Sequence, residues 1–190
     1  SFPIFNNCEF SYNSNMDDNY GGAGVKTSSG GGVTFNSCKF QYNQQAANGS
    51  AFAHNRNNSG SVQFNNCLIT NNEVHNPYNG RGGAISIYTN TAVFIRNTTI
   101  ADNVTYSDNL DHELGAGISI ESQLFSGPSL TYPKIALINN IIYGNQVVFS
   151  DGSTDNSQIV FSTSLIETGY QEWNGLPRGM STLVFSHNNI

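Results

Sequence analysis

The sequence predicts an all-β protein, a right-handed parallel β-helix of six to seven coils in a single domain over 1–190. Three observations predict this fold. A short motif recurs along the chain, a Gly-rich block follows most copies of it, and no segment shows helical periodicity. Apolar residues make up 37% of the 190 residues, which is enough to fill the core of one such domain.

The recurring motif has a Cys, an apolar residue two positions later and an Asn five positions after the Cys. Equivalent positions in successive copies are separated by 30, 29, 31 and 42 residues, and the last two copies replace the Cys. The copies are IFNNCEFSYN at 4–13, VTFNSCKFQYN at 33–43, VQFNNCLITNN at 62–72, VFIRNTTIADN at 93–103 and ALINNIIYGN at 136–145. Coils of this length stack on one another, so equivalent side chains are expected to form columns.

Three columns are expected inside the stack. The thiol column comprises Cys8, Cys38 and Cys67; the apolar column Phe10, Phe40, Ile69, Ile100 and Ile142; the asparagine column Asn13, Asn43, Asn72, Asn103 and Asn145. Residues two apart on a strand point to the same side, so Cys38 and Phe40 are expected to face the interior together.

Each column has a predicted structural role. We expect the thiols to be free and buried as small apolar groups, although neighbouring strands lie close enough for a strained disulfide. The asparagines are expected at a sharp turn, where their amides bond the next coil and the local backbone as a ladder.

The Gly-rich blocks each lead into a further strand. They are GGAGVK at 21–26, NGSAFAH at 48–54, GRGGAISIY at 80–88 and LGAGISIE at 114–121. Together with one strand before the Cys and one after it, they predict three strands per coil. Residues 35–43 also fit the template of a leucine-rich repeat, but the count of three strands per coil favours a β-helix. Two fainter copies place Ser164 and Ile166 in the motif and begin another coil at 184–190.

The pairing of Phe-x-x-Asn with a Gly-Gly-Ala block resembles the repeats of polymorphic outer-membrane autotransporter passenger domains. The matching segments are 10–13, 40–43 and GGAI at 82–85, with GAGI at 115–118 as a looser copy. LINNIIYGN and VFSTSLIETGY also resemble secreted bacterial β-helix proteins that carry a sorting anchor. The resemblance implies an extracellular or cell-surface location. Because the chain begins and stops inside a repeat, we expect a fragment of a longer protein, attached to a membrane only through segments outside these residues.

A carbohydrate-active enzyme is the alternative function, because many β-helix proteins are polysaccharide lyases or glycoside hydrolases. Hydrolysis of a glycoside needs two carboxylates at a fixed separation. Asp17 and Asp18 are the only adjacent acidic pair, and they lack the Gly-His-Gly and Arg-Ile-Lys companions of polygalacturonases. Arg178, a candidate base for a lyase, has no acidic cluster beside it in the sequence. We therefore assign no catalytic residue and keep a carbohydrate-active enzyme as the alternative.

Metal and nucleic-acid signals are weak. Asp151 and Asp155 in DGSTDNS are weak calcium candidates, because their spacing does not fit an EF-hand loop, and no other cofactor is expected. The cysteine spacing matches no zinc site. A net charge of −6 without a cluster of Lys or Arg argues against a nucleic-acid surface. No apolar run of about 18 residues encodes a transmembrane helix.

Two insertions are the expected binding elements, because loops on a rigid solenoid usually carry its function. They span 104–134 and 169–180, and the second contains Tyr170, Trp173 and Arg178. These three residues are expected to contact a glycan or a surface protein; alternatively, the loop folds back over the edge of a coil. The sequence thus favours a non-catalytic, adhesin-like scaffold.

Overall fold

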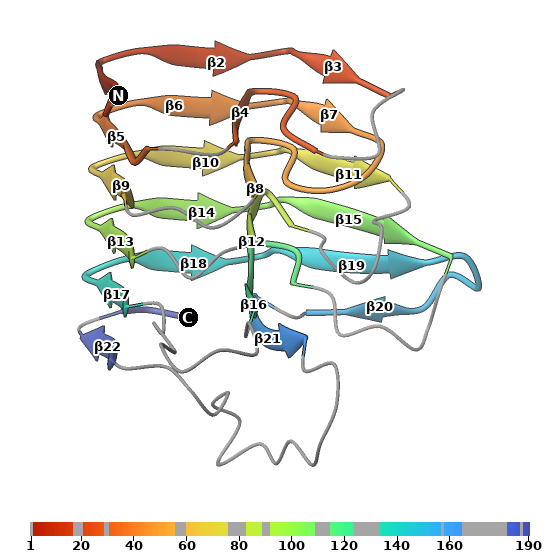
Figure 1. Cartoon of the computed structure of the whole chain (residues 1–190). Coiled ribbons are helices and arrows are strands. Elements are labelled where there is room, and N and C mark those ends of the chain that lie inside the picture. The colour runs from red at the N-terminus through yellow and green to blue at the C-terminus, as the bar shows by residue number, and fades with distance from the viewer. Residues whose placement is uncertain are drawn as a thin grey trace.

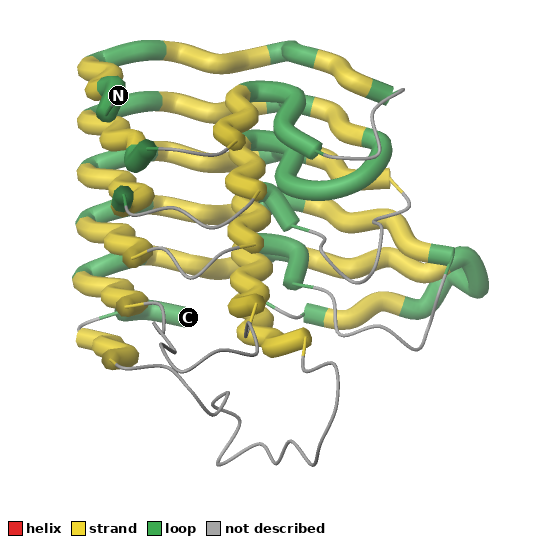
Figure 2. Tube along the Cα trace, in the orientation of Figure 1, coloured by secondary structure: helices red, strands yellow, loops and turns green. Residues whose placement is uncertain are grey.

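The computed structural model describes residues 2–16, 21–28, 31–55, 60–75, 83–88, 92–108, 115–123, 134–156, 158–164, 182–186 and 188–190. Every regular element in these ranges is a β-strand, as Figure 2 shows. The strands form four sheets, and the chain passes through the sheets in the same order in every coil.

The first two sheets contain the strands on either side of the Cys position. The first sheet consists of β1 (Ile4–Asn6), β5 (Val33–Asn36), β9 (Ser61–Asn65), β13 (Ala92–Arg96), β17 (Lys134–Ile138) and β22 (Thr182–Ser186). The second consists of β2 (Glu9–Ser11), β6 (Lys39–Gln41), β10 (Leu68–Thr70), β14 (Thr99–Ala101) and β18 (Ile141–Tyr143).

The other two sheets follow the asparagine and the Gly-rich block. The third consists of β3 (Ser14–Asn15), β7 (Gln44–Gln45), β11 (Glu73–His75), β15 (Val104–Ser107), β19 (Gln146–Phe149) and β20 (Thr154–Asp155). The fourth consists of β4 (Val25–Ser28), β8 (Phe52–Asn55), β12 (Ile85–Tyr88), β16 (Ile118–Gln123) and β21 (Ile159–Ser164).

Neighbouring coils pair in parallel and in register, which confirms the predicted parallel β-helix. Phe10 lies opposite Phe40, and the column continues through Ile69, Ile100 and Ile142. In Figure 1 the coils stack from β1 to β3 at the N-terminal end down to β22, and the fourth sheet forms a separate column of strands. The one antiparallel pair among the described strands is β19 with β20.

The coil count and the strand count differ from the prediction. The first four coils have four strands each instead of three, because a further short strand follows the asparagine, and the fifth coil adds β20. In the described part of the chain the second and fourth sheets have five strands each, so five coils contribute a strand to every sheet and β22 begins a sixth. Ser164 belongs to β21 in the fourth sheet and not to the motif; Ile166 lies outside the described residues. That segment misled the prediction because fourth-sheet strands also alternate apolar and polar residues. The copy at 184–190 is correct, since Phe185 pairs with Leu137.

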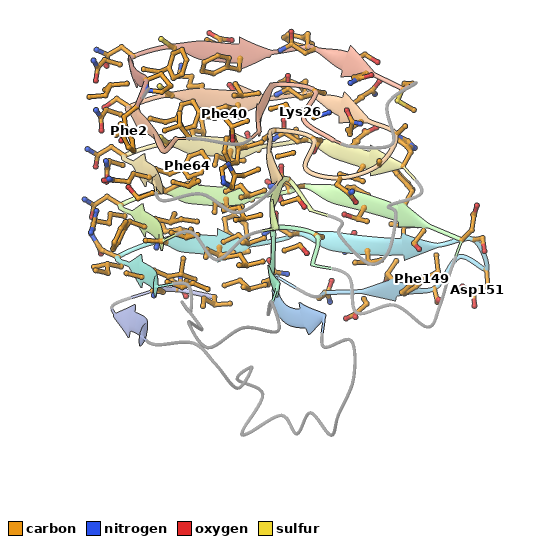
Figure 3. The ribbon with its side chains drawn as sticks, viewed as in Figure 1. Phe2, Lys26, Phe40, Phe64, Phe149 and Asp151 are labelled. Atoms are coloured by element: carbon orange, nitrogen blue, oxygen red, sulfur yellow. The ribbon has the colours of Figure 1, made fainter. Side chains whose placement is uncertain are left out.

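The core is aromatic in the first coils and aliphatic further along. The Phe35 ring stacks on Phe64 with centroids 5.0 Å apart and meets Phe40 edge-on at 5.0 Å. Phe52 of the fourth sheet closes the interior against Phe35 at 5.6 Å. Figure 3 shows Phe40 and Phe64 within the stack of coils. Later coils fill the same space with branched residues such as Ile95. The filled interior makes the stack a rigid support.

Two corners in every coil share one backbone device, a residue with positive φ followed by an inward side chain. The first corner uses Asn7, Ser37, Asn66, Asn97 and Asn139, with φ between 50° and 56°. The second uses Tyr12, Tyr42, Asn71, Asp102 and Gly144, with φ between 55° and 66°. A Cβ on Gly144 would lie 2.5 Å from a carboxylate oxygen of the exposed Asp102 side chain, which can move, so the φ of 66° is what favours glycine there.

The asparagine ladder lies at the second corner, as predicted. The backbone N–H and Nδ2 of Asn43 both donate to Oδ1 of Asn72, at 3.1 and 2.8 Å. The same Nδ2 also donates to the Phe10 carbonyl of the preceding coil at 2.8 Å. Equivalent bonds join Asn13, Asn43, Asn72, Asn103 and Asn145 in one continuous chain. The amides thereby satisfy backbone groups that the turn would otherwise leave buried and unpaired.

The thiol column lies at the first corner and not within a strand. Cys38 and Cys67 are buried and free, whereas Cys8 in the first coil is only half-buried. The Cys38 thiol donates to the Phe5 carbonyl at 3.4 Å. In later coils Thr98 and Asn140 take the same position, and the Thr98 N–H donates to Oδ1 of Asn140 at 2.9 Å. The cysteines of the first three coils therefore occupy the coil position at which later coils form a second ladder, from Thr98 to Asn140.

Candidate functional site

The candidate site is the outer face of the third sheet with its adjoining corner, here called the third-sheet face. It comprises Tyr12, Tyr42, Gln44, Glu73, His75 and Tyr106. Strand alternation explains the arrangement, because Gln45 and Val74 are fully buried on the inner side. Gln44, Glu73 and His75 beside them therefore point outward, as does Tyr106 beside the buried Thr105 in the next coil.

The tyrosines at the corner form an exposed pair. Their rings are stacked, with centroids 4.9 Å apart and planes inclined by 12°. Tyr12 is 76% exposed and Tyr42 is 45% exposed. Both residues have positive φ, 58° and 56°, a conformation that bulky side chains rarely adopt. The equivalent residues in the next three coils, Asn71, Asp102 and Gly144, are the types that tolerate it. The backbone conformation of this corner therefore does not account for the presence of tyrosine at positions 12 and 42.

A polar cluster lies on the strands beside this pair. His75 Nε2 is 3.3 Å from Oε2 of Glu73, and Gln44 Nε2 donates to the same oxygen at 3.2 Å. The His75 ring stacks on Tyr106 with centroids 4.8 Å apart. About a third of each of the Glu73 and His75 side chains remains exposed. The cluster therefore holds its amide, carboxylate and imidazole in fixed positions while leaving part of each open to solvent.

This combination of groups is suited to ligand recognition. Flat exposed rings offer an apolar surface, and the amide and carboxylate beside them offer donors and acceptors. One carboxylate, that of Glu73, belongs to the cluster, and the carboxylate of Asp102 lies at the adjoining corner. Within the described ranges, no three His, Cys, Asp or Glu residues are grouped so that they could hold a metal ion. The third-sheet face can therefore recognise a ligand through stacking and hydrogen bonds.

The calcium candidates lie elsewhere, on the β19–β20 hairpin. Asp151 is at the tip, where Figure 3 shows it away from the stacked coils, and Asp155 is in β20. Oδ1 of Asp151 accepts hydrogen bonds from the backbone N–H and the hydroxyl of Ser153, at 2.8 and 2.6 Å. These bonds hold the pKa of the Asp151 carboxyl below its ordinary value. Asp151 thus stabilises the turn, and calcium binding there stays a prediction.

The predicted binding residues Tyr170, Trp173 and Arg178 lie outside the described residues, as do Asp17 and Asp18. The 169–180 insertion is outside them entirely, and the 104–134 insertion is described only at 104–108, 115–123 and 134. Sequence reasoning missed the third-sheet face. One signal could have found it: Tyr12 and Tyr42 both directly precede a ladder asparagine, at a position where other coils have small polar residues or glycine.

A buried histidine lies on the fourth sheet, outside the third-sheet face. His54 is fully buried on β8, and its Nδ1 lies 2.6 Å from the Thr27 hydroxyl oxygen. Its Nε2 has no hydrogen-bond partner within the described ranges. Burial lowers the pKa of His54 to about 4, so the ring is neutral near pH 7. It points into the core and does not contribute to the third-sheet face.

No protein-family model, curated protein or solved structure matches the chain. The described part of the chain contains no helix able to cross a membrane. The resemblance to secreted bacterial β-helix proteins accordingly remains an expectation from the repeat motifs.

Proposed function

We propose that this protein is a non-catalytic scaffold of the secreted or cell-surface, adhesin-like kind, and that it binds a glycan or a protein partner. The observation that carries this proposal is the exposed Tyr12–Tyr42 stack beside the Gln44–Glu73–His75 cluster. Exposed aromatic residues beside polar groups are characteristic of recognition surfaces.

The rigid coil stack supports the proposal, because a binding surface gains from groups that are already ordered before the ligand arrives. The asparagine ladder fixes the corner that carries the tyrosines, and the filled core fixes the strands that carry the polar cluster. The bacterial origin and the extracellular location belong to the same proposal and rest on the repeat resemblance. The insertions at 104–134 and 169–180 would add contacts to the same scaffold. No nucleic-acid partner is proposed for a chain with net charge −6.

Two measurements on the same purified chain test this proposal. The first compares retention on immobilised polysaccharides and on whole bacterial and host cells with retention on uncoated supports. The second incubates the chain with pectin, alginate and neutral polysaccharides in the presence of calcium and follows release of reducing or unsaturated ends. We expect binding without release. Release of sugar ends that is abolished by Glu73→Gln or by Asp17→Asn with Asp18→Asn would replace the scaffold with the alternative enzyme.

A further inference from the structure

Tyr12 and Tyr42 lie at the second corner in a backbone conformation that disfavours aromatic residues. In the described coils this position is filled by Tyr, Tyr, Asn, Asp and Gly in order, all with positive φ. Asn and Gly adopt this conformation readily, whereas an aromatic side chain is strained there. Strained residues that persist tend to cluster where function requires them.

The exposure of the two rings shows that they do not fill the core. Tyr42 covers one face of Tyr12, yet Tyr12 remains 76% exposed. Among the described rings, none other stacks on Tyr12. The Tyr12–Tyr42 stack thus presents a flat apolar surface at a corner whose backbone is held by the ladder bond from the Asn13 N–H to Oδ1 of Asn43, 3.2 Å long.

A second flat surface lies further along the same face. The stacked rings of His75 and Tyr106 are in the third and fourth coils, four residues beyond the corner position. At a rise of about 3.3 Å per residue and about 4.8 Å per coil, the two stacks are roughly 15 Å apart. Gln44 and Glu73 lie between them and are bonded to each other at 3.2 Å. A ligand that touches both stacks must therefore be extended, with polar groups between two apolar contacts.

Charge narrows the class of ligand. The carboxylates of Glu73 and Asp102 lie on this face and its corner, and the whole chain has a net charge of −6. An acidic polysaccharide would meet repulsion there. A pyranose ring has a face of C–H groups that can stack on an aromatic ring, and hydroxyls at its edge that can bond amides and carboxylates. A chain of neutral sugars matches both the apolar stacks and the polar groups between them.

We infer that the third-sheet face binds a neutral oligosaccharide, with one sugar stacked on Tyr12 and Tyr42 and another near His75 and Tyr106. Gln44 and Glu73 bond the hydroxyls of the sugars between these stacks. This inference rests on the proposed binding function and names the ligand class for it. It also explains why tyrosine occupies two positions whose positive φ asparagine would adopt more easily.

The test uses the whole chain and the residue that the third coil has at this corner. The double variant Tyr12→Asn with Tyr42→Asn places at both positions the residue type of Asn71, which favours the required φ. The matched control is Tyr143→Asn, an exposed tyrosine on β18 outside the third-sheet face. Calorimetry measures binding of cellohexaose, xylohexaose and mannohexaose, with oligogalacturonate and oligomannuronate as acidic probes.

We expect wild type and Tyr143→Asn to bind at least one neutral hexasaccharide more tightly than the acidic probes. The double variant should bind about tenfold more weakly or worse, which corresponds to loss of about 1.4 kcal/mol. Its melting temperature should be equal to or above that of wild type. Unchanged affinity in the double variant, or a lowered melting temperature, would overturn the assignment of the tyrosines.

The remaining outcomes separate this inference from the proposed function. If wild type binds none of the neutral probes but is retained on cells or on acidic polysaccharides, the ligand class is wrong and the scaffold function stands. If wild type cleaves a probe, the non-catalytic function itself fails. If retention on cells is removed by protease but unchanged after enzymatic removal of the surface glycans, the partner is a protein and the glycan inference is wrong.

Discussion

Gln158 closes the asparagine ladder by taking the place of a sixth asparagine beside Asn145. Its Oε1 accepts hydrogen bonds from the backbone N–H and Nδ2 of Asn145, at 3.2 and 2.7 Å, and its Nε2 donates to the Asn145 carbonyl at 2.9 Å. Gln158 lies only 13 residues beyond Asn145, whereas ladder neighbours are 29 to 42 residues apart. The second corner thus ends in a local cap, while the first corner continues to Asn188.

Replacing Gln158 with Ala should remove this cap and leave the backbone N–H of Asn145 and one N–H of its side-chain amide without an acceptor. The other amide N–H still donates to the Ile100 carbonyl. Leaving buried donors unpaired costs about 1–3 kcal/mol each, and partial access of water at this end favours the lower value. Urea denaturation measures the loss. Gln146→Ala is the control, since Gln146 is an exposed residue of the same coil. Equal effects of the two substitutions would show that Gln158 does not cap the ladder.

Replacing Asn43 with Ala should destabilise the protein more than replacing Asn13. Asn43 is fully buried and bonds both neighbouring coils, whereas Asn13 is exposed in the first coil. We expect a loss of roughly 1–3 kcal/mol for Asn43→Ala and less for Asn13→Ala. Thermal melts of both variants test the order. A reversed order would indicate that the ladder is stabilised from its end and not from its interior.

Replacing Phe40 with Ala should cost roughly 3–5 kcal/mol, because the coils on either side cannot close the cavity. Phe40 is fully buried between Phe10 at 4.8 Å and Phe35 at 5.0 Å. Phe10→Ala is the control, since Phe10 belongs to the first coil and is only partly buried. Urea denaturation should show a smaller loss for the control. Similar losses would mean that the first coil packs as tightly as the second.

The repeat spacing was enough to predict the fold, because Cys38, Phe40 and Asn43 recur in register and stacked coils place like residues together. The additional strand that follows the ladder asparagine, in the third sheet, could not be predicted from the second coil. There it consists of Gln44–Gln45, which is short, polar and without apolar alternation. The sequence predicts a strand at the thiol corner because Cys38 and Phe40 are two residues apart, a spacing that places both side chains on one side of a strand. A positive φ at Ser37 produces the same inward direction through a turn.

Apart from its two corner tyrosines, the third-sheet face could not be predicted, because its strand residues come from three coils and are polar or aromatic without a motif of their own. Only stacking brings Tyr12 to Tyr42, and His75 to Tyr106. The sequence instead directed attention to Tyr170, Trp173 and Arg178 because they lie in an insertion. An aromatic residue at a corner where other coils have Asn, Asp or Gly is the kind of local inconsistency that marks a functional position.

The three thiols should differ in reactivity because they differ in burial. Burial raises the pKa of Cys67 to about 11 and also raises the pKa of Cys38, so both are protonated and inaccessible at pH 8. Cys8 is half-buried. With a disulfide reagent at pH 8, one thiol should react quickly in the folded protein and three in urea. Cys8→Ser is the control and should remove the fast phase; a fast phase that persists would place another thiol at the surface.

His54 should make stability depend on pH between its folded and unfolded pKa values. The pKa falls from 6.5 in the unfolded chain to about 4 in the folded protein, because burial disfavours the charged ring. Between these values the unfolded state binds more protons, so stability is full above pH 6.5 and falls as the pH drops towards 4. The loss should reach up to about 3 kcal/mol. The matched variant is His54→Ile, because β12 has Ile87 at the paired position. Urea midpoints at pH 7 and pH 4.5 should differ less for this variant than for wild type, and an equal difference would assign the acid sensitivity to other groups.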